Sequence, residues 1–422
     1  MRNLFKLHRH TSSIGMIIKG ATIYHNGRFV TRDIEVAGGC IVRIGLSIEG
    51  EDAVDASSHV LIPGVRNRHM HASSVLIRGA PSGGGLDAWV RNWLWRFEET
   101  LSRKEAYYGA LYSMCQMARA GITYFEEMHF HESDVMDACC DIGLRASLSE
   151  AIMDRQEWDD PLATLDTTMA LARKARSSSL VDVKMGIVSI RMTSGELIDA
   201  CVGAVNDHPD LFSGYHVHLN EVSLDAKISK EEYGALPAEV FHDKGVLGSS
   251  TTLAHCVHMH PREIELLAST KSTAVACIGS NLRLHSGTPP IQAMLQADVP
   301  LGMGIDSPAI NDGYDLLSDV RIIGLIYGLD PTVLIPLLCG CGGLVEGMEA
   351  DLAFINKAAL FPWKDIATTV SYGANTGCID HVMVNGRFIV WNKRVTTVDE
   401  ERVARKAGAV AEKVWSRLEC PE

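Results

Sequence analysis

Two hydrophobic patterns alternate along most of this chain. Helix-length segments such as SRKEAYYGALYSMCQMARA have apolar residues at helical spacing. Between them lie eight short runs rich in apolar and β-branched residues: HVLIPGV, GITYFEE, LRASLSE, VDVKMGIVSI, LFSGYHVHL, STTLAHC, STAVACI and VPLGMGID. Strand–helix alternation repeated in this way predicts an α/β protein with a (β/α)8 barrel of the TIM type.

The two ends of the chain carry a different pattern. Short apolar alternations occur near both ends, and each end contains an NGR turn, which is typical of β-hairpins. The final segment has helical spacing and an acidic first turn. We therefore expect an N-terminal extension (1–15), a small β-sandwich domain built from both termini (16–62 and 350–400), the barrel (63–349) and a C-terminal helix (401–422).

Composition narrows the classes of function. The 422 residues carry a formal net charge of -13, which argues against a nucleic-acid-binding surface. No apolar run reaches the length of a membrane span, and the N-terminus lacks the features of a signal peptide. The 11 cysteines form no complete disulfide framework. We expect a cytoplasmic protein that acts on a small molecule and binds neither nucleic acid nor membrane.

Chemically active side chains follow four of the eight runs. The carboxyl ends of barrel strands form the active site in this fold. A lone histidine there is usually a surface or core residue, and a lone aspartate is usually a cap. Their joint occurrence favours a single site instead. The residues, in chain order, are His69 and His71, His218 and Glu221, His255, and Asp306.

Strand geometry explains how the two histidines could bind one ion. Residues two apart in a strand point to the same side, so His69 and His71 can reach one metal ion in the barrel mouth. A third imidazole and a carboxylate would complete a site with one position left for water. Water bound to such an ion loses a proton near neutral pH, and a nearby glutamate can carry that proton.

Six stretches resemble a known family. They are LIPGVRNRHMH, ARAGITYFEEM, HVHLNE, LAHC, GSNLRLHSGTPP and GIDSPAIND. Together they resemble the cytosine deaminase-like branch of the amidohydrolase superfamily, which includes S-adenosylhomocysteine/methylthioadenosine deaminases and chlorohydrolase-type enzymes. The resemblance extends from about residue 16 to residue 400. It is specific for the branch but not for a substrate.

The resemblance implies a role for each residue of the set. It implies one divalent ion, zinc or in some members iron, held by His69, His71, His218 and Asp306. Glu221 would shuttle protons, and His255 would orient and polarise the attacking water. Asp306 would also take a proton from that water.

The implied activity is that of a hydrolase acting on non-peptide C–N bonds. Water would attack an amidine-like carbon of an amino-substituted purine, pterin, pyrimidine or triazine, and ammonia would leave. A second metal would need a bridging group on the fourth strand, where Lys184 is the only candidate and is expected to be a surface residue. The family commonly forms homo-oligomers, so we expect one here.

The stretch after the fourth strand departs from the deaminase pattern. Val188 occupies the usual histidine position, and Arg191 follows three residues later. This resembles the formiminoglutamate deiminases, in which an arginine binds a substrate carboxylate. The alternatives are therefore a deiminase of a carboxylate-bearing formimino or guanidino compound, or an Arg191 that only forms an internal salt bridge. A shortened segment after the eighth strand adds a third possibility, a non-catalytic barrel.

Further substrate contacts are expected from three other side chains. Arg78 follows the H-x-H loop and would either touch substrate or brace that loop. Trp89 and Trp93, after a glycine-rich loop, could stack on a flat heterocycle. Each could instead be a core residue, and we expect Trp95 to pack in the core.

Overall fold

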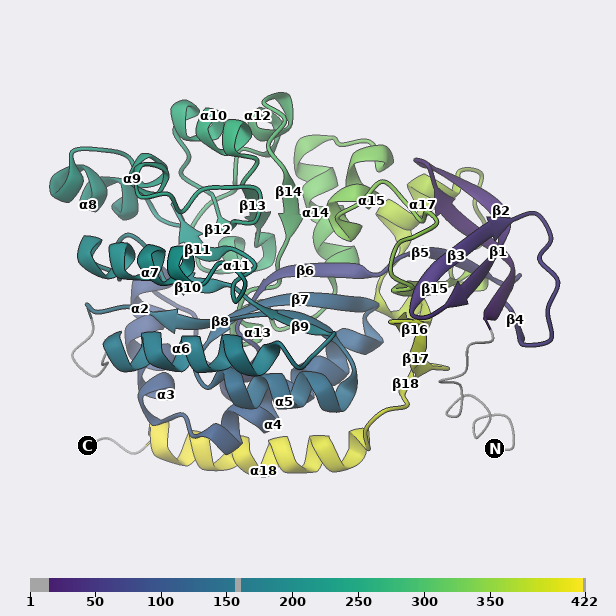
Figure 1. Ribbon diagram of the computed structural model, residues 1–422, viewed down its shortest axis with the longest axis horizontal. Helices are drawn as coiled ribbons and strands as arrows, with labels where there is room; N and C mark the ends of the chain where they lie inside the picture. The colour runs from purple at the N-terminus through teal and green to yellow at the C-terminus, as the bar shows by residue number, and fades with distance from the viewer. Residues whose placement is uncertain (1–14, 156–160, 420–422) are drawn as a thin grey trace.

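The computed structural model describes residues 15–155 and 161–419. The predicted N-terminal extension (1–15) lies almost wholly outside these ranges. A closed barrel of parallel strands with helices around it forms one body, and a separate sheet built from both ends of the chain stands at its side (Figure 1). The predicted fold class is confirmed.

The barrel has eight strand positions, because β9 and β10 share one place beside β8. The ring closes where Met303 of β14 pairs with Asn67 of β6. The strands are β6 (Val65–Met70), β7 (Ile122–His129), β8 (Arg145–Ile152), β9 (Val181–Val183), β10 (Met185–Ile187), β11 (Tyr215–Leu219), β12 (Thr252–His255), β13 (Thr273–Ala276) and β14 (Leu301–Met303).

The first barrel strand is not the apolar run that the sequence indicated. That run, HVLIP, forms β5 (His59–Pro63) in the other sheet, where it pairs with β15. The barrel strand begins at Val65, directly after Gly64. A Cβ on Gly64 would lie only 1.9 Å from Oγ1 of Thr123, so the close approach of the chain to β7 requires glycine there.

The second sheet has nine strands, eight in one continuous order and β4 paired with β1 beside that order, and it has its own apolar core. Ile23, Ile34, Leu61 and Phe354 of that core come from four different strands and are fully buried. Besides β5, the strands are β1 (Met16–His25), β2 (Arg28–Ala37), β3 (Cys40–Gly45), β4 (Ala53–Asp55), β15 (Leu352–Asn356), β16 (Ile379–Val384), β17 (Arg387–Trp391) and β18 (Arg394–Val395).

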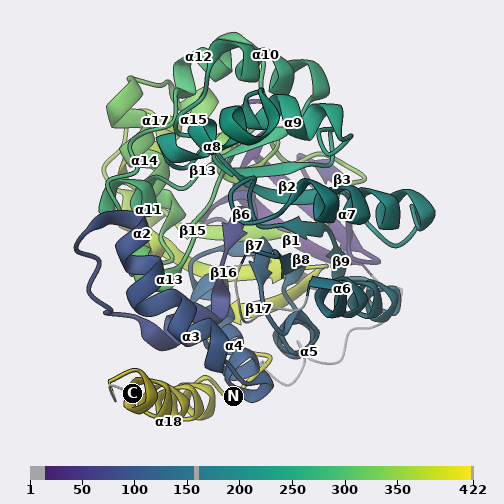
Figure 2. The same cartoon turned by 90° about the vertical axis from the view of Figure 1, so that its left-hand side faces the viewer.

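Helices surround the barrel in the end-on view of Figure 2. Those that follow barrel strands are α4 (Arg103–Arg119), α5 (Glu132–Ile142), α6 (Pro161–Ala175), α7 (Gly195–Asp207), α8 (Ser223–Tyr233), α9 (Pro237–Asp243), α10 (Pro261–Thr270), α11 (Ile278–Arg283), α12 (Ile291–Gln296), α13 (Pro308–Asn311), α14 (Leu316–Tyr327) and α15 (Pro331–Cys339). Three short segments, α16 (Lys357–Leu360), α17 (Ile366–Gly373) and η3 (Thr376–Cys378), lie between β15 and β16.

Two helical stretches lie outside this ring, one between β6 and α4 and one at the C-terminal end of the described chain. The first begins with a 3₁₀ turn, η1 (Ala72–Ile77), and continues with α2 (Gly85–Trp89), the π-helical segment η2 (Val90–Leu94) and α3 (Trp95–Thr100). Side chains of α2, η2 and α3 reach the carboxyl ends of the strands. The C-terminal helix α18 (Glu400–Glu419) buries one apolar face and packs along α4. Within residues 15–155 and 161–419, no helix has the length and apolar character needed to cross a membrane.

Candidate active site

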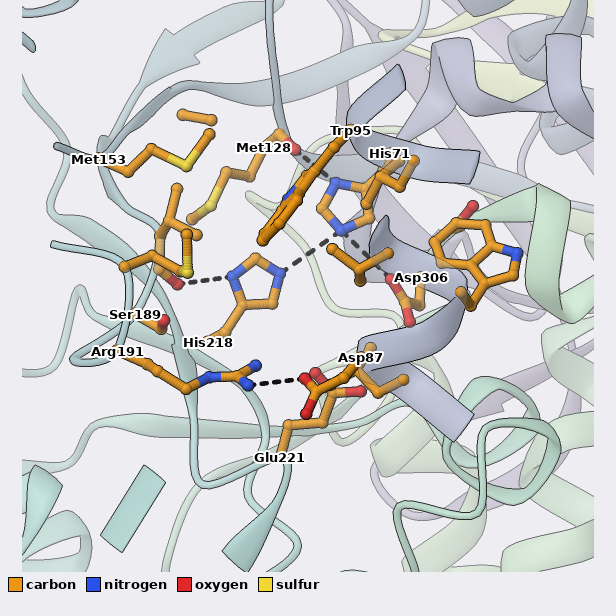
Figure 3. Close-up of a pocket in the computed structure, with 18 of the residues that line it drawn as sticks. His71, Asp87, Trp95, Met128, Met153, Ser189, Arg191, His218, Glu221 and Asp306 are labelled. Carbon is orange, nitrogen blue, oxygen red and sulfur yellow. Dashed lines mark hydrogen bonds and ion pairs between the residues drawn. The ribbon is translucent and has the colours of Figure 1, made fainter. Parts of the chain in front are cut away.

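A cavity of about 350 Å³ opens at the carboxyl ends of the barrel strands. Side chains at the ends of the barrel strands and in the segments that follow them line it, and α2, η2 and α3 cover one side. Figure 3 draws the apolar residues Trp95, Met128 and Met153 on one side and the charged residues Arg191 and Glu221 on another. This is the end of the barrel at which the sequence placed the site.

Three imidazoles converge at the bottom of the cavity. Ligand atoms of His69, His71 and His218 all lie within 4.8 Å of one another. Nδ1 of His71 donates to the carbonyl of Met128 at 2.5 Å, and Nδ1 of His218 donates to the carbonyl of Val188 at 2.7 Å (Figure 3). These bonds hold the Nδ1 protons and leave both Nε2 atoms as the ring nitrogens that can bind a cation.

His69 is held from behind by a further histidine. Its Nδ1 lies 2.9 Å from Nε2 of His216, which is also fully buried. Nε2 of His69 is buried and has no hydrogen-bond partner among the described residues. Burial lowers the pKa of His216 to about 3, so that ring stays neutral. A buried imidazole nitrogen that faces inward and has no hydrogen-bond partner is typical of a metal ligand.

Asp306 adds a carboxylate to the three imidazoles. Its Oδ1 lies 3.5 Å from Nε2 of His69 and 3.2 Å from Nε2 of His71. Its Oδ2 accepts a hydrogen bond from the hydroxyl of Ser280. The backbone φ of Asp306 is +66°, a region that non-glycine residues rarely occupy and that is enriched at functional sites.

Glu221 and His255 stand next to this cluster. Nε2 of His255 lies 3.7 Å from Oε2 of Glu221, and its Nδ1 lies 2.9 Å from the amide oxygen of Asn281. The φ of His255 is also positive, at +73°. Burial raises the pKa of Glu221, while the nearby His255 opposes that rise. A carboxyl with a raised pKa exchanges protons more readily near neutrality.

The donor set fits a divalent cation. Three imidazoles and one carboxylate are ligands that zinc and related ions prefer. Lys184, the candidate bridge to a second ion, does not face the cavity. It is buried in the barrel interior, where its Nζ donates to Glu126 at 2.6 Å and to Thr252 at 2.7 Å. The expectation of a surface lysine was therefore wrong.

Arg191 lines the cavity but is paired with its own chain. Its Nη1 donates to Asp87 at 2.8 Å, and its Nε lies 3.2 Å from Oδ1 of Asp225. Arg78 does not line the cavity. It pairs with Asp312 at 3.2 Å, behind the H-x-H loop, and 42% of its side chain is exposed.

The two tryptophans that line the cavity are not the two expected from the sequence. Trp89 and Trp95 line the cavity, whereas Trp93 packs against Trp415 of α18 with ring centroids 5.6 Å apart. In a regular α-helix, residues four apart share a face. The π-helical turn at Val90–Leu94 widens the spacing and turns Trp95 into the cavity in place of Trp93. The expected core position of Trp95 was wrong.

Several residues of the site have no sequence pattern that would identify them. Asn281 belongs to the stretch GSNLRLHSGTPP, but nothing in the sequence showed that it would lie against His255. His129 is the last residue of β7, where a lone histidine is usually a surface or core residue. It lines the cavity, fully buried, with its Nε2 3.1 Å from Glu98. The carbonyls of Met128 and Val188 have no side-chain signature at all.

Comparison with known proteins shows the family. The model of the Amidohydrolase family matches residues 60–335. The 5-methylthioadenosine/S-adenosylhomocysteine deaminase of Pyrococcus furiosus is 30% identical over 418 residues, which cover 93% of this chain and 99% of the relative. The enzyme of the same name from Moorella thermoacetica is 28% identical, covering 84% and 87%.

A solved structure shows the same fold. The zinc-bound adenosine deaminase from Xanthomonas campestris superposes with a TM-score of 0.88 at 20% identity, covering 96% of this chain and 99% of that one. The chain belongs to the amidohydrolase family. It is a hydrolase that acts on C–N bonds, as the resemblance implied.

Proposed function

We propose that this chain is a metal-dependent deaminase that hydrolytically releases ammonia from an amino-substituted purine or a related nitrogen heterocycle. One observation carries the proposal. His69, His71, His218 and Asp306 converge in the same cavity as Glu221 and His255, although they come from four separate strand ends. The names of the curated relatives, which are 5-methylthioadenosine/S-adenosylhomocysteine deaminases, support a purine nucleoside as the preferred type.

A cation would be held by His69, His71, His218 and Asp306. Such an ion supplies Lewis acidity and an acidic bound water. We propose one ion per chain and zinc as its identity, because the donor set suits zinc and the solved adenosine deaminase is described with bound zinc.

The chain's own residues supply the proton transfers. Glu221 is 9% exposed and carries the proton to the ring nitrogen of the substrate. His255, fixed by Asn281, orients the attacking water with its Nε2. Asp306, with one oxygen held by Ser280, accepts the proton of that water through the other oxygen.

The cavity walls fit a flat, largely apolar ring. Trp95, Met128, Met153 and Val188 line the cavity and offer aromatic, thioether and aliphatic contacts. Among the expected substrate contacts, Trp89 and Arg191 line the cavity and stay in the proposal. Arg78 and Trp93 lie outside its lining, so we assign them to bracing the loop and to packing.

The two alternatives receive no support. Arg191 would anchor a formimino or guanidino acid only if its charge were free, and Asp87 and Asp225 already face it. A non-catalytic barrel would not need a complete set of ligands and proton carriers inside one cavity. Helices α14 and α15 also complete the barrel after β14, despite the short segment.

Ammonia release from a panel of substrates tests the proposal. Adenosine, 5-methylthioadenosine, guanine, pterin, cytosine, an aminotriazine and formiminoglutamate would be offered to the zinc-loaded protein. We expect turnover of a purine. Glu221→Gln should lower kcat roughly a hundredfold to ten-thousandfold. Glu265→Gln, on the exposed face of α10, is the matched control. Absence of ammonia from every compound would refute the proposal.

The remaining expectations stay proposals. The ten described cysteines are free, which suits the reducing cytoplasm. We propose domain limits at 16–62 with 350–400, 63–349 and 401–422, which the two separate sheets and α18 support. We also propose a homo-oligomer, which light scattering of the purified protein would measure.

A further inference from the structure

Arg191 is enclosed by carboxylates of its own chain. Its Nη1 donates to Oδ1 of Asp87 at 2.8 Å (Figure 3). Oδ1 of Asp225 lies 3.2 Å from its Nε. The three residues come from different elements. Arg191 follows β10, Asp87 belongs to α2 and Asp225 belongs to α8. The charge cluster therefore links three elements inside the cavity.

The two acidic partners differ in how firmly they are placed. The side chain of Asp225 is 7% exposed, and its Oδ2 accepts a hydrogen bond from the backbone of Val222. The side chain of Asp87 is 53% exposed. It follows Gly84 and Gly85, whose φ angles of +98° and +79° suit glycine. Asp87 is thus the partner that can be exchanged.

We propose that Asp87 is a specificity-determining residue that occupies the guanidinium of Arg191 in place of a substrate carboxylate, so that the cavity selects uncharged substrates over anionic ones. The inference rests on the proposed deaminase function. In a carboxylate-binding deiminase the arginine binds the substrate, whereas here the guanidinium of Arg191 is occupied by Asp87.

The balance of charge supports this role. Asp87, Asp225 and Glu221 all line the cavity around Arg191. An incoming carboxylate must either displace Asp87 or remain beside these acids, and like charges at short range are costly. Asp87 is attached to the same chain, so it competes at a high effective concentration. Excluding a ligand by repulsion is a common source of specificity.

Removal of Asp87 should open the guanidinium to an external carboxylate. Arginine presents a planar fork that pairs well with carboxylates. The test uses two pairs of compounds that differ only in a carboxylate: adenosine-5′-carboxylate and its methyl ester, and pterin-6-carboxylate and its methyl ester. The pairs place the carboxylate at different distances from the ring. The measured quantity is the ratio of kcat/KM for acid and ester, determined from ammonia release.

We expect the wild-type protein to favour the ester. Asp87→Ala and Asp87→Asn should shift the ratio toward the acid by about tenfold, and adding Arg191→Ala should cancel the shift. Asp137→Ala is the matched control, because Asp137 is a similarly exposed partner of a basic residue, Lys174, on the outer helices.

The outcomes separate the inference from the proposed function. Turnover of the esters with a ratio that Asp87→Ala and Asp87→Asn leave unchanged would overturn the inference alone. A wild-type preference for the acids would do the same. Absence of ammonia from all four compounds, when a compound of the first panel is turned over, would also overturn the inference alone. Absence of ammonia from both sets would overturn the proposed function together with the inference.

Discussion

The amide oxygen of Asn281 lies 2.9 Å from Nδ1 of His255. An amide oxygen only accepts hydrogen bonds, so Nδ1 carries a proton and Nε2 is the ring nitrogen turned toward the site. Nε2 lies on the side of Glu221, whose Oε2 is 3.7 Å away. Asn281 therefore sets both the tautomer and the orientation of the histidine that is proposed to position water.

Removing the amide oxygen of Asn281 should slow the reaction but leave the metal bound. Substitutions behind an active histidine typically cost ten- to a hundredfold, so Asn281→Ala should lower kcat by about that factor. KM and metal content should change little, and Asn281→Asp, which keeps an acceptor, should retain more activity. Steady-state kinetics over a range of pH, with metal analysis, would measure this. A wild-type kcat in Asn281→Ala would contradict the assigned role.

The metal site makes a prediction that does not depend on turnover. His218→Ala removes one of the converging imidazoles and should lower the zinc that the protein retains after dialysis. It should also reduce the thermal stabilisation that added zinc provides, because an ion that binds only the folded state stabilises it. His242→Ala, an exposed histidine on α9, should bind like wild type. Equal zinc content in the two variants would refute the ligand assignment.

The sequence revealed the barrel and the ligand set because both leave strong local patterns. Eight strand-like runs marked the fold, and the H-x-H and H-x-x-E spacings marked the site. The first strand was misplaced because β5 is apolar after its first residue, His59, whereas β6 carries Arg66 and Arg68. Those charges are satisfied by distant residues. Arg66 lies 4.5 Å over the ring of Tyr124, and Arg68 donates to Glu126 at 3.0 Å.

The cavity lining was harder to predict, for physical reasons. The orienting acceptors of His71 and His218 are backbone carbonyls, which every residue has. The direction in which the Trp95 side chain points depends on one π-helical turn, and no residue type specifies such a turn. The ion pair between Arg191 and Asp87 joins residues 104 positions apart, and only the fold brings them together.

The buried cluster around Glu126 predicts a loss of stability in acid. Burial alone would raise the pKa of Glu126, but Lys184 and Arg68 outweigh burial and hold it at about 2. An ordinary glutamate titrates near ~4.3, so this carboxylate should contribute about 3 kcal/mol above pH ~5. The contribution should disappear as the pH falls from about 4 through about 2. Urea unfolding of the wild-type protein across this range would measure the decline.

Glu126→Gln is the matching substitution. It leaves two buried cations without their carboxylate and should cost roughly 3–5 kcal/mol of unfolding free energy at pH 7. The difference from wild type should shrink in acid, where wild-type Glu126 is itself protonated. Glu265→Gln provides a solvent-exposed control that should show no such pH dependence. A constant difference at every pH would mean that the loss arises from packing instead of charge.

Trp95 and Trp93 offer a comparison within one helical segment. Trp95 lines the cavity, so Trp95→Ala should raise KM about tenfold for a flat heterocycle, since stacking of a base on an aromatic ring is worth ~1–3 kcal/mol. Trp93 packs against Trp415 of α18, so Trp93→Ala should leave KM near wild type and lower the unfolding free energy by about 1–3 kcal/mol. Kinetics and urea unfolding of both variants would separate these roles. An equal rise of KM in the two variants would show that the π-helical turn does not decide which ring meets the substrate.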